Sequence, residues 1–230
     1  MRHIGLVGGL SPESTIEYYK IICSEYNKKF GGQEMPQVTI RSINLQQVAD
    51  FMADHRLSDL AGLIIGAIRD LEGAGADFAA IATNSPHIAF EMIDAKSPLD
   101  LISIMEATAE QVNIDKIRTV GLIGTRFTMQ ADFYQKVLSK QNIKTVVPYQ
   151  TQMKMIDNII WDELVHGVIK DSSRGAYKNV IESLQERGCE GVILGCTEIP
   201  LLIKPEDSPI ITYDTATLHA KAILQYALKP

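Results

Sequence analysis

The sequence predicts an α/β protein built from two similar Rossmann-like halves, each with a parallel sheet. Strand and helix patterns alternate along the chain, as they do in βα units. Residues 75–83 also align without a gap on residues 188–196, which places Thr83 on Cys196. A duplicated half that carries a different group at its tip predicts two chemistries around one ligand.

Bulk composition narrows the class of protein. The 230 residues allow one large domain or two small ones, and 46% hydrophobic with 22% charged residues is ordinary for a globular protein. The net charge of -6 argues against nucleic acid or an anionic membrane as the main partner, because both require a basic face. A small anionic ligand stays possible, and no apolar run is long enough to span a membrane.

The three cysteines, Cys23, Cys189 and Cys196, show no metal-binding spacing. The N-terminal residues resemble a strand and not a signal peptide, so we expect reduced thiols and a cytoplasmic protein. Asp214 and His219 lack a convincing third ligand, so we expect no metal site.

The first half begins with a strand at Ile4–Val7 that Gly8 and Gly9 interrupt. Ser11 then provides a helix N-cap, and Pro12 suits the first helical position. A strand at 38–43, a helix at 57–72 and a strand at 78–82 are predicted to follow.

The second half repeats this order, with strands at 120–124, 143–147 and 192–194 and helices opening at 125–128 and spanning 177–186. Ser97-Pro98 and Ser208-Pro209 each precede a strand, which is a further correspondence. We predict a first domain of residues 1–98 plus 207–230 and a second of residues 99–206. The helix at 218–228 would then return to the first domain.

Ligands of open α/β sheets bind beyond the carboxyl ends of the strands. Four loops are predicted there, and two halves facing each other would bring them into one cleft: 8–14, 83–87, 124–128 and 196–200. The loop at Gly8–Ser11 is no GxGxxG fingerprint and no P-loop motif occurs, so a nucleotide cofactor is not indicated. This loop suits equally well a carboxylate seat at a helix N-terminus or a tight capped turn.

Cys196 is the strongest candidate for chemistry. A free cysteine is most often a small buried hydrophobe, but this one lies at the end of a strand and precedes Thr197 and Glu198. Backbone N–H groups of the following turn could stabilise its thiolate. Cys23 and Cys189 lack this placement, and we interpret them as structural.

Other polar residues at the strand ends are ambiguous. Thr83 suits a turn, or a hydroxyl donor on the face of a ligand opposite Cys196. We interpret His87, which follows Pro86, as a structural histidine with satisfied hydrogen bonds. Arg126 is the best-placed cation for an anionic ligand, although a plain surface arginine is at least as consistent with the sequence.

Three motifs together resemble the aspartate/glutamate racemase family. Residues 4–15, Ile-Gly-Leu-Val-Gly-Gly-Leu-Ser-Pro-Glu-Ser-Thr, resemble its opening, and the Gly-Cys-Thr-Glu of residues 195–198 resembles its second cysteine motif. Residues 82–87, Ala-Thr-Asn-Ser-Pro-His, are similar to its first motif, usually Cys-Asn-Thr-x-His. The match covers essentially the whole chain.

This resemblance implies a racemase without pyridoxal phosphate or another cofactor. It implies two domains related by pseudo-twofold symmetry, an active site between them, a homodimer, and a dicarboxylic amino acid as substrate. In the family two cysteines flank the α-carbon, one removing its proton and the other returning a proton to the opposite face. The matching catalytic positions are Thr83 and Cys196, and the candidate substrate-binding residues are Leu10, Ser11, Asn84, Ser85, Thr125, Thr128, Thr197 and Glu198.

The sequence departs from the family pattern in two places. Thr83 replaces the first cysteine, as in one family branch, and a hydroxyl is much less acidic than a thiol. We therefore expect lopsided activity, in which Cys196 deprotonates the L enantiomer and Thr83 delivers a proton slowly. Gln46-Gln47 and Val165-His166 lie near positions where some aspartate racemases carry Arg and Lys, so side-chain carboxylate recognition must differ.

Two other functions are consistent with these residues. Arylmalonate decarboxylases of the same superfamily use one cysteine in the second half to protonate an enediolate, which Cys196 could do. Alternatively, the chain could bind small acids without turnover.

Overall fold

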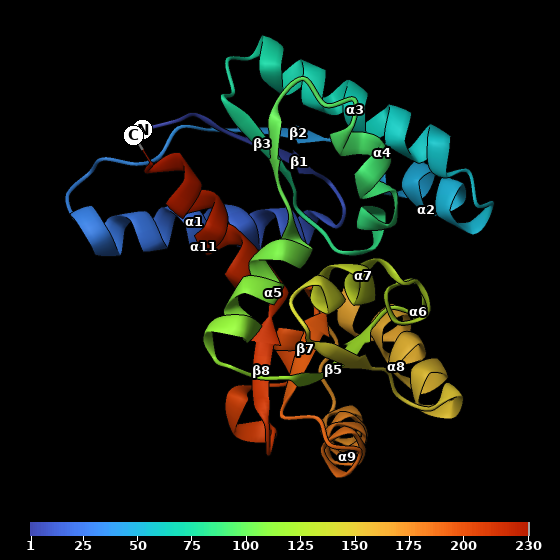
Figure 1. Cartoon of the computed structure of the whole chain (residues 1–230). Helices are drawn as coiled ribbons and strands as arrows, with labels where there is room; N and C mark the ends of the chain where they lie inside the picture. Colours follow the sequence, from blue (N-terminus) through green and yellow to red (C-terminus); the bar gives the residue numbers. More distant parts are fainter. Residues whose placement is uncertain (230) are drawn as a thin grey trace. The chain divides into compact units, whose positions relative to one another are not determined.

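The computed structural model describes residues 1–229 and divides into two compact units (Figure 1). The first unit comprises residues 1–104 and the chain from residue 216 onward, and the second comprises residues 105–215. Among the helices of the described residues, none combines the length and apolar character that a membrane span requires.

The first unit contains a four-stranded parallel sheet with the order β2-β1-β3-β4. Its strands are β1 (Ile4–Gly8), β2 (Val38–Ser42), β3 (Phe78–Ile81) and β4 (Asp100–Ile102). Its helices are α1 (Pro12–Phe30), α2 (Leu45–Ala53), α3 (Leu57–Gly73), the 3-10 helix η1 (Ser85–Ala89), α4 (Phe90–Asp94) and α11 (Thr215–Ala227).

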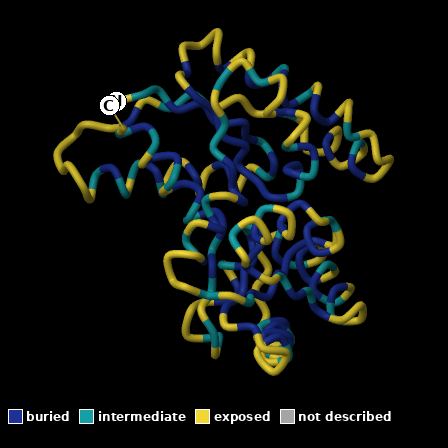
Figure 2. Tube along the Cα trace, viewed as in Figure 1, coloured by how far each residue is buried: buried dark blue, intermediate teal, exposed yellow. Residues whose placement is uncertain are grey.

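The two central strands of this sheet are buried along their whole length, because helices cover both faces (Figure 2). Helices α1 and α11 pack on one face, where Leu6 and Phe78 form a cluster with Tyr18 and Ile223. On the other face α3 approaches so closely that a Cβ at Gly5 would lie 3.3 Å from Leu71.

The second unit contains a four-stranded parallel sheet with the order β6-β5-β7-β8. Its strands are β5 (Thr119–Gly124), β6 (Lys144–Val146), β7 (Gly191–Gly195) and β8 (Ile211–Asp214). Its helices are α5 (Ile104–Ile114), α6 (Arg126–Gln130), α7 (Phe133–Lys140), α8 (Gln150–Asp162), η2 (Leu164–His166), α9 (Asp171–Glu186), α10 (Ile199–Leu202) and η3 (Pro205–Asp207).

Helices α8 and α9 bury one face of the second sheet. Ile156 of α8 and Ile181 of α9 join Ile123 and Val192 in one apolar cluster, which also includes Cys196. The candidate catalytic thiol therefore belongs to the hydrophobic core of this unit.

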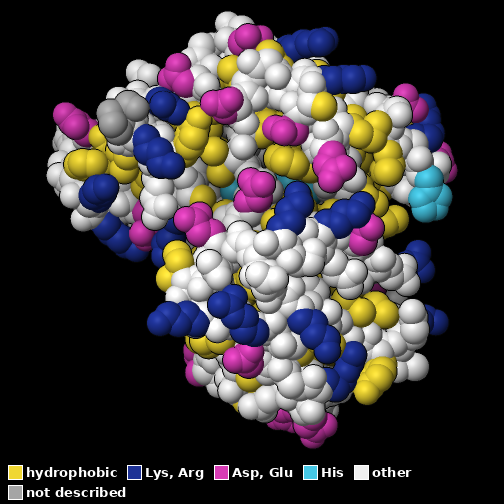
Figure 3. Space-filling model, in the orientation of Figure 1, with side chains coloured by type: hydrophobic (Ala, Val, Ile, Leu, Met, Phe, Trp, Pro, Cys, Tyr) yellow, Lys and Arg dark blue, Asp and Glu magenta, His cyan; other side chains and the backbone are white. Residues whose placement is uncertain are grey.

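On the molecular face in Figure 3 acidic and basic side chains are interspersed, without an extended patch of one sign.

The identical strand order of the two units confirms the predicted α/β class with two parallel sheets. The sheets that β4 and β8 join differ from those implied by the expected domain boundaries at 98 and 206. Strand β4 pairs with β3 and strand β8 pairs with β7, so each Ser-Pro turn leads into the last strand of its own sheet and does not start a new half. The division into two folding domains stays a proposal.

Candidate active site

The turn after β1 is tied to the first helix through Thr15. The Thr15 hydroxyl accepts a hydrogen bond from Gly9 N at 2.8 Å and donates one to Ser11 O at 2.8 Å. Ser11 caps α1, because its Oγ accepts from Ser14 N at 3.3 Å. The capped turn considered from the sequence is thus present, and it uses the Gly9 N–H internally.

Gly9 is required in this turn for two reasons. Its φ of +84° lies in the left-handed region, and a Cβ there would lie 2.4 Å from Ile43 O. The neighbouring Leu10 is only 5% exposed, so its side chain is part of the core. The contact of Leu10 with a substrate stays a prediction.

The loop after β3 lies beside this turn, because β1 and β3 are paired neighbours with Val7 opposite Ile81. Ser14 Oγ donates to Ala82 O at 2.9 Å and ties α1 to the loop. Thr83 and Asn84 are buried, at 9% and 3% exposure. The first unit thus brings its two predicted loops together at the carboxyl ends of its two central strands.

His87 follows in η1 and is the least satisfied polar side chain of this loop. It is 1% exposed, its ring stacks on Phe90 at 5.3 Å, and neither ring nitrogen makes a hydrogen bond. Burial, assisted by the nearby His219, lowers its pKa to about 3, although the backbone of Asn84 and Thr83 opposes the shift. His87 is structural in placement, and its ring nitrogens lie near the backbone of Asn84 and Thr83 without a hydrogen bond of good geometry.

In the second unit the loop after β5 starts with Thr125. Its Oγ1 accepts from Thr128 N at 3.3 Å and so caps α6, and the two hydroxyls are 3.2 Å apart. Thr128 is completely buried against the glycines that end β5 and β7. The side chain of Arg126 is exposed, while its backbone N–H donates to Asp157 Oδ1 at 2.8 Å.

The loop after β7 carries the predicted catalytic cysteine. Gly195 pairs with Gly124, so Cys196 and Thr125 continue from neighbouring strand ends. Cys196 Sγ donates to Glu198 Oε2 at 2.9 Å, and Thr197 Oγ1 donates to the same oxygen at 2.9 Å. Cys196 and Glu198 are each 8% exposed.

This environment keeps Cys196 a neutral thiol. Burial raises its pKa well above the ordinary value, and the Glu198 carboxylate and Asp157 raise it further. The Glu198 N–H does lower the pKa, as the sequence suggested for the turn after the strand, but it is outweighed. The fold therefore opposes the resting thiolate that we expected.

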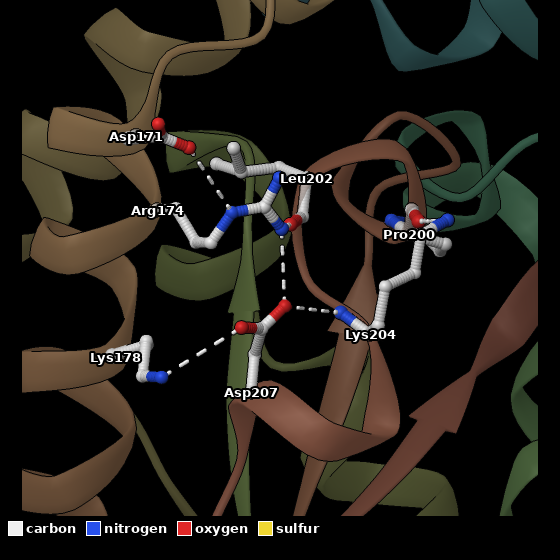
Figure 4. A network of polar contacts seen from close by, with 7 residues as sticks. All are labelled: Asp171, Arg174, Lys178, Pro200, Leu202, Lys204 and Asp207. Carbon is white, nitrogen blue, oxygen red and sulfur yellow. Dashed lines mark hydrogen bonds and ion pairs between the residues drawn. The ribbon is translucent and has the colours of Figure 1, made fainter.

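A network of charged groups holds the far end of α10 (Figure 4). Arg174 of α9 donates to the carbonyl of Leu202 and pairs with Asp207 Oδ2 at 3.0 Å. Lys204 Nζ donates to Pro200 O at 2.6 Å, and its N–H donates to Asp207. Because α10 begins directly after Glu198, this network fixes the segment that follows the Cys196 turn.

Two groups that act on the Cys196 thiol or on the α10 segment after it escaped the sequence analysis. Asp157 lies on α8 and affects Cys196 only because the second unit folds α8 beside β5. Arg174 lies 28 residues before the carbonyl that it contacts. No local pattern marks either residue, since both act across the tertiary fold. No cluster of three potential metal ligands occurs in residues 1–229.

The motifs and the duplicated fold have counterparts in known proteins. The family model described as Asp/Glu/Hydantoin racemase matches residues 7–223. The chain belongs to this racemase family. The broad specificity amino-acid racemase RacX of Bacillus subtilis is 25% identical over 227 residues, which cover 95% of each chain.

Solved structures agree with this membership of the racemase family. A Yersinia pestis protein described as a proposed Asp/Glu racemase is 36% identical, with a TM-score of 0.94 and full coverage of both chains. An aspartate racemase homologue from Pyrococcus horikoshii OT3 is 34% identical, with a TM-score of 0.88 and full coverage of both chains. Racemases are isomerases, so the relatives define the enzyme class of the family.

Proposed function

We propose that this chain is a pyridoxal-phosphate-independent racemase that inverts the α-carbon of aspartate, glutamate or both. Thr83 and Cys196 serve as the two proton-transfer groups. Thr197, Asn84 and Ser85 are proposed to contact the substrate, and the other predicted substrate-binding residues keep that role as a proposal: Leu10, Ser11, Thr125, Thr128 and Glu198.

One observation carries the proposal. The thiol of Cys196 stands at the carboxyl end of β7, hydrogen-bonded to Glu198, within the Gly-Cys-Thr-Glu sequence that resembles the second cysteine motif of the family. Inversion by proton transfer requires an acid and a base within hydrogen-bond reach of the α-carbon. A thiol with a carboxylate partner can exchange a proton in both directions, whereas an inert core cysteine has no such partner.

Thr83 makes the proposed exchange of the α-proton unequal for the two enantiomers. A threonine hydroxyl ionises far less readily than a thiol, so it is a poor base at neutral pH. We propose that Cys196 removes the α-proton of the L enantiomer and that Thr83 returns a proton slowly to the opposite face. The preorganised donors of the two loops would stabilise the negative charge that develops on the substrate.

The decisive measurement is the exchange of the α-proton for deuterium in deuterated water, followed by NMR. Both enantiomers of aspartate and glutamate should be tested on the wild type, on Cys196→Ala and on Cys189→Ala. Cys189 is buried and structural, so its variant is the matched control. We expect Cys196→Ala to lose all exchange and Cys189→Ala to retain it.

Two outcomes would contradict parts of this function. Exchange that survives in Cys196→Ala would exclude Cys196 as the acid/base, and equal rates for both enantiomers would exclude the asymmetry. Tight binding of aspartate or glutamate without exchange in the wild type would instead indicate a protein that binds small acids.

A decarboxylase of the arylmalonate type is the second candidate, and the resting state of Cys196 favours it. That reaction breaks the bond to one carboxylate, releases carbon dioxide and leaves an enediolate. The thiol proton then adds to the α-carbon, and solvent reprotonates the sulfur. A neutral thiol is what this step requires. Carbon dioxide release from a disubstituted malonate, without amino-acid exchange, would support this candidate.

Substrate range, assembly and location complete the proposal. Gln46 lies near the position where some aspartate racemases carry a cation, and its Nε2 donates a hydrogen bond to Asp50 Oδ1 at 2.8 Å. Neutral amino acids should therefore join the panel of the exchange experiment. A homodimer is proposed from the family resemblance, and analytical ultracentrifugation would test it. A cytoplasmic location is proposed because the cysteines are free thiols.

A further inference from the structure

We propose that Glu198 is the proton-accepting partner of Cys196 and that the two residues move a proton as one unit. As the sulfur takes the substrate α-proton, the thiol proton passes to the Glu198 carboxylate, and in the reverse direction Glu198 returns it. This inference rests on the proposed function and gives Glu198 a role through the thiol, distinct from contact with the substrate.

The geometry supplies the path for the proton. Cys196 Sγ lies 2.9 Å from Glu198 Oε2, which is within hydrogen-bond reach, and both residues are buried. Thr197 Oγ1 donates to the same oxygen and holds it in place. Glu198 itself is fixed as the residue that precedes α10, so its carboxylate returns toward the thiol two residues earlier.

The electrostatic surroundings oppose a free thiolate as the resting base. The groups that face Cys196 are the Glu198 carboxylate, Asp157 of α8 and the phenol of Tyr177 on α9. Both carboxylates raise the pKa of the thiol, and burial raises the pKa of the phenol, so it stays neutral. If the thiol first lost its proton to water, its ionisation would be opposed by burial and by both carboxylates.

Transfer to Glu198 avoids that intermediate. The α-carbon loses a proton and keeps the electron pair, the sulfur exchanges one proton for another, and the carboxylate becomes a carboxylic acid. The Cys196–Glu198 pair thus gains one proton overall, and no isolated thiolate forms beside Asp157. In the opposite direction the thiol protonates the α-carbon, and Glu198, which then starts as a carboxylic acid, returns its proton to the sulfur.

The substitution Glu198→Gln separates this mechanism from a preformed thiolate. Removing the carboxylate removes the main charge that opposes ionisation, so the Cys196 thiol should titrate at lower pH. A thiolate base would then be more abundant and exchange would accelerate. If Glu198 must receive the proton, exchange slows although the thiol has become more acidic.

The experiment follows two quantities across pH in the wild type, Glu198→Gln, Glu198→Asp and Glu182→Gln. Thiolate absorbance, taken as the difference from each protein with Cys196→Ala added, reports the titration of the thiol. Deuterium exchange of each enantiomer reports catalysis. Glu182 is exposed on α9 and gives a matched loss of one carboxylate.

We expect Glu198→Gln to shift thiol titration to lower pH and to slow exchange of the enantiomer that Cys196 deprotonates by about 100-fold or more. Glu198→Asp should restore part of the exchange, and Glu182→Gln should match the wild type in both quantities. Faster exchange in Glu198→Gln, in proportion to its thiolate, would overturn the proposal.

The two proposals fail separately. If the wild type exchanges no amino acid, the racemase function is wrong, while the thiol titration still tests the pair. An unchanged titration in Glu198→Gln would show that the carboxylate does not control the thiol and would sink this inference alone. Circular dichroism of each variant controls for folding.

Discussion

The hydroxyl of Tyr18 lies 2.8 Å from Nδ1 of His219, although the two residues are 201 positions apart in the sequence. On its other side His219 Nε2 lies 2.8 Å from Ile102 O. A carbonyl only accepts, so Nε2 carries the ring proton and Nδ1 accepts from the tyrosine. A neutral imidazole therefore links α1, α11 and β4 within the core of the first unit.

This buried imidazole predicts loss of stability in mild acid. Burial lowers the pKa of His219 to about 4, while in the unfolded chain a histidine titrates near ~6.5. The unfolded state thus binds more protons between these values, so the free energy of unfolding falls as pH decreases from about 6.5 to about 4, and is fully retained above this window. We expect a loss approaching ~1.4 kcal/mol per pH unit from each such histidine.

Urea unfolding between these pH values tests this expectation. His219→Gln should show a flatter pH dependence than the wild type, and His87, which has a pKa of about 3, should add a similar slope. The exposed His166 supplies the control His166→Gln, whose slope should match the wild type. An unchanged slope in His219→Gln would contradict the prediction.

Thr83→Cys should make the two exchange directions more equal. The side chain stays in the same buried loop and gains a group that is able to act as a base. We expect the slower direction to accelerate about 10- to 100-fold in deuterium exchange, and Thr83→Ala to slow it further. Thr151→Cys, on the exposed side of α8, is the matched control. A Thr83→Cys protein as lopsided as the wild type would contradict the assignment.

Arg174→Ala should slow exchange through the position of the Cys196 turn. It removes the donor to Leu202 O and the pair with Asp207, so α10 is no longer held at its far end. We expect kcat to fall about 3- to 10-fold, because the Cys196 turn loses its alignment with the substrate. KM should change little, because the contacts that bind the substrate are kept. Arg187→Ala, which loses a similar hydrogen bond to Val147 O, should leave kcat unchanged. Equal effects of the two variants would exclude a positioning role.

Gly9→Ala should destabilise the protein, whereas Gly62→Ala should not. Gly9 has a positive φ and no space for a Cβ, so alanine there costs about 1–3 kcal/mol. Gly62 lies on an exposed position of α3 with open space around its Cα, and alanine there favours the helix by about 0.5–1 kcal/mol. Urea unfolding of both variants measures the difference, and a change of the same sign in both would contradict it.

Much of the secondary structure followed from local patterns, because these elements carry their signals within a few residues. The apolar period of residues 57–72 predicted α3, and Ser11 with Pro12 predicted the start of α1 at Pro12. Helix α9 begins at Asp171, six residues before the predicted Tyr177. Asp171 and Ser172 of its first turn are exposed and the turn gives a weak apolar pattern, so only tertiary contacts define that end.

The sequence by itself determined the α/β class, the repeated succession of strands and helices and the family, because periodicity, turn residues and the Gly-Cys-Thr-Glu motif are all local. It also located Cys196 at the end of a strand. Only the tertiary structure decided that this thiol is neutral and that the ring nitrogens of His87 lack hydrogen bonds of good geometry. Both depend on burial and on charges from distant elements such as α8, which no stretch of sequence contains.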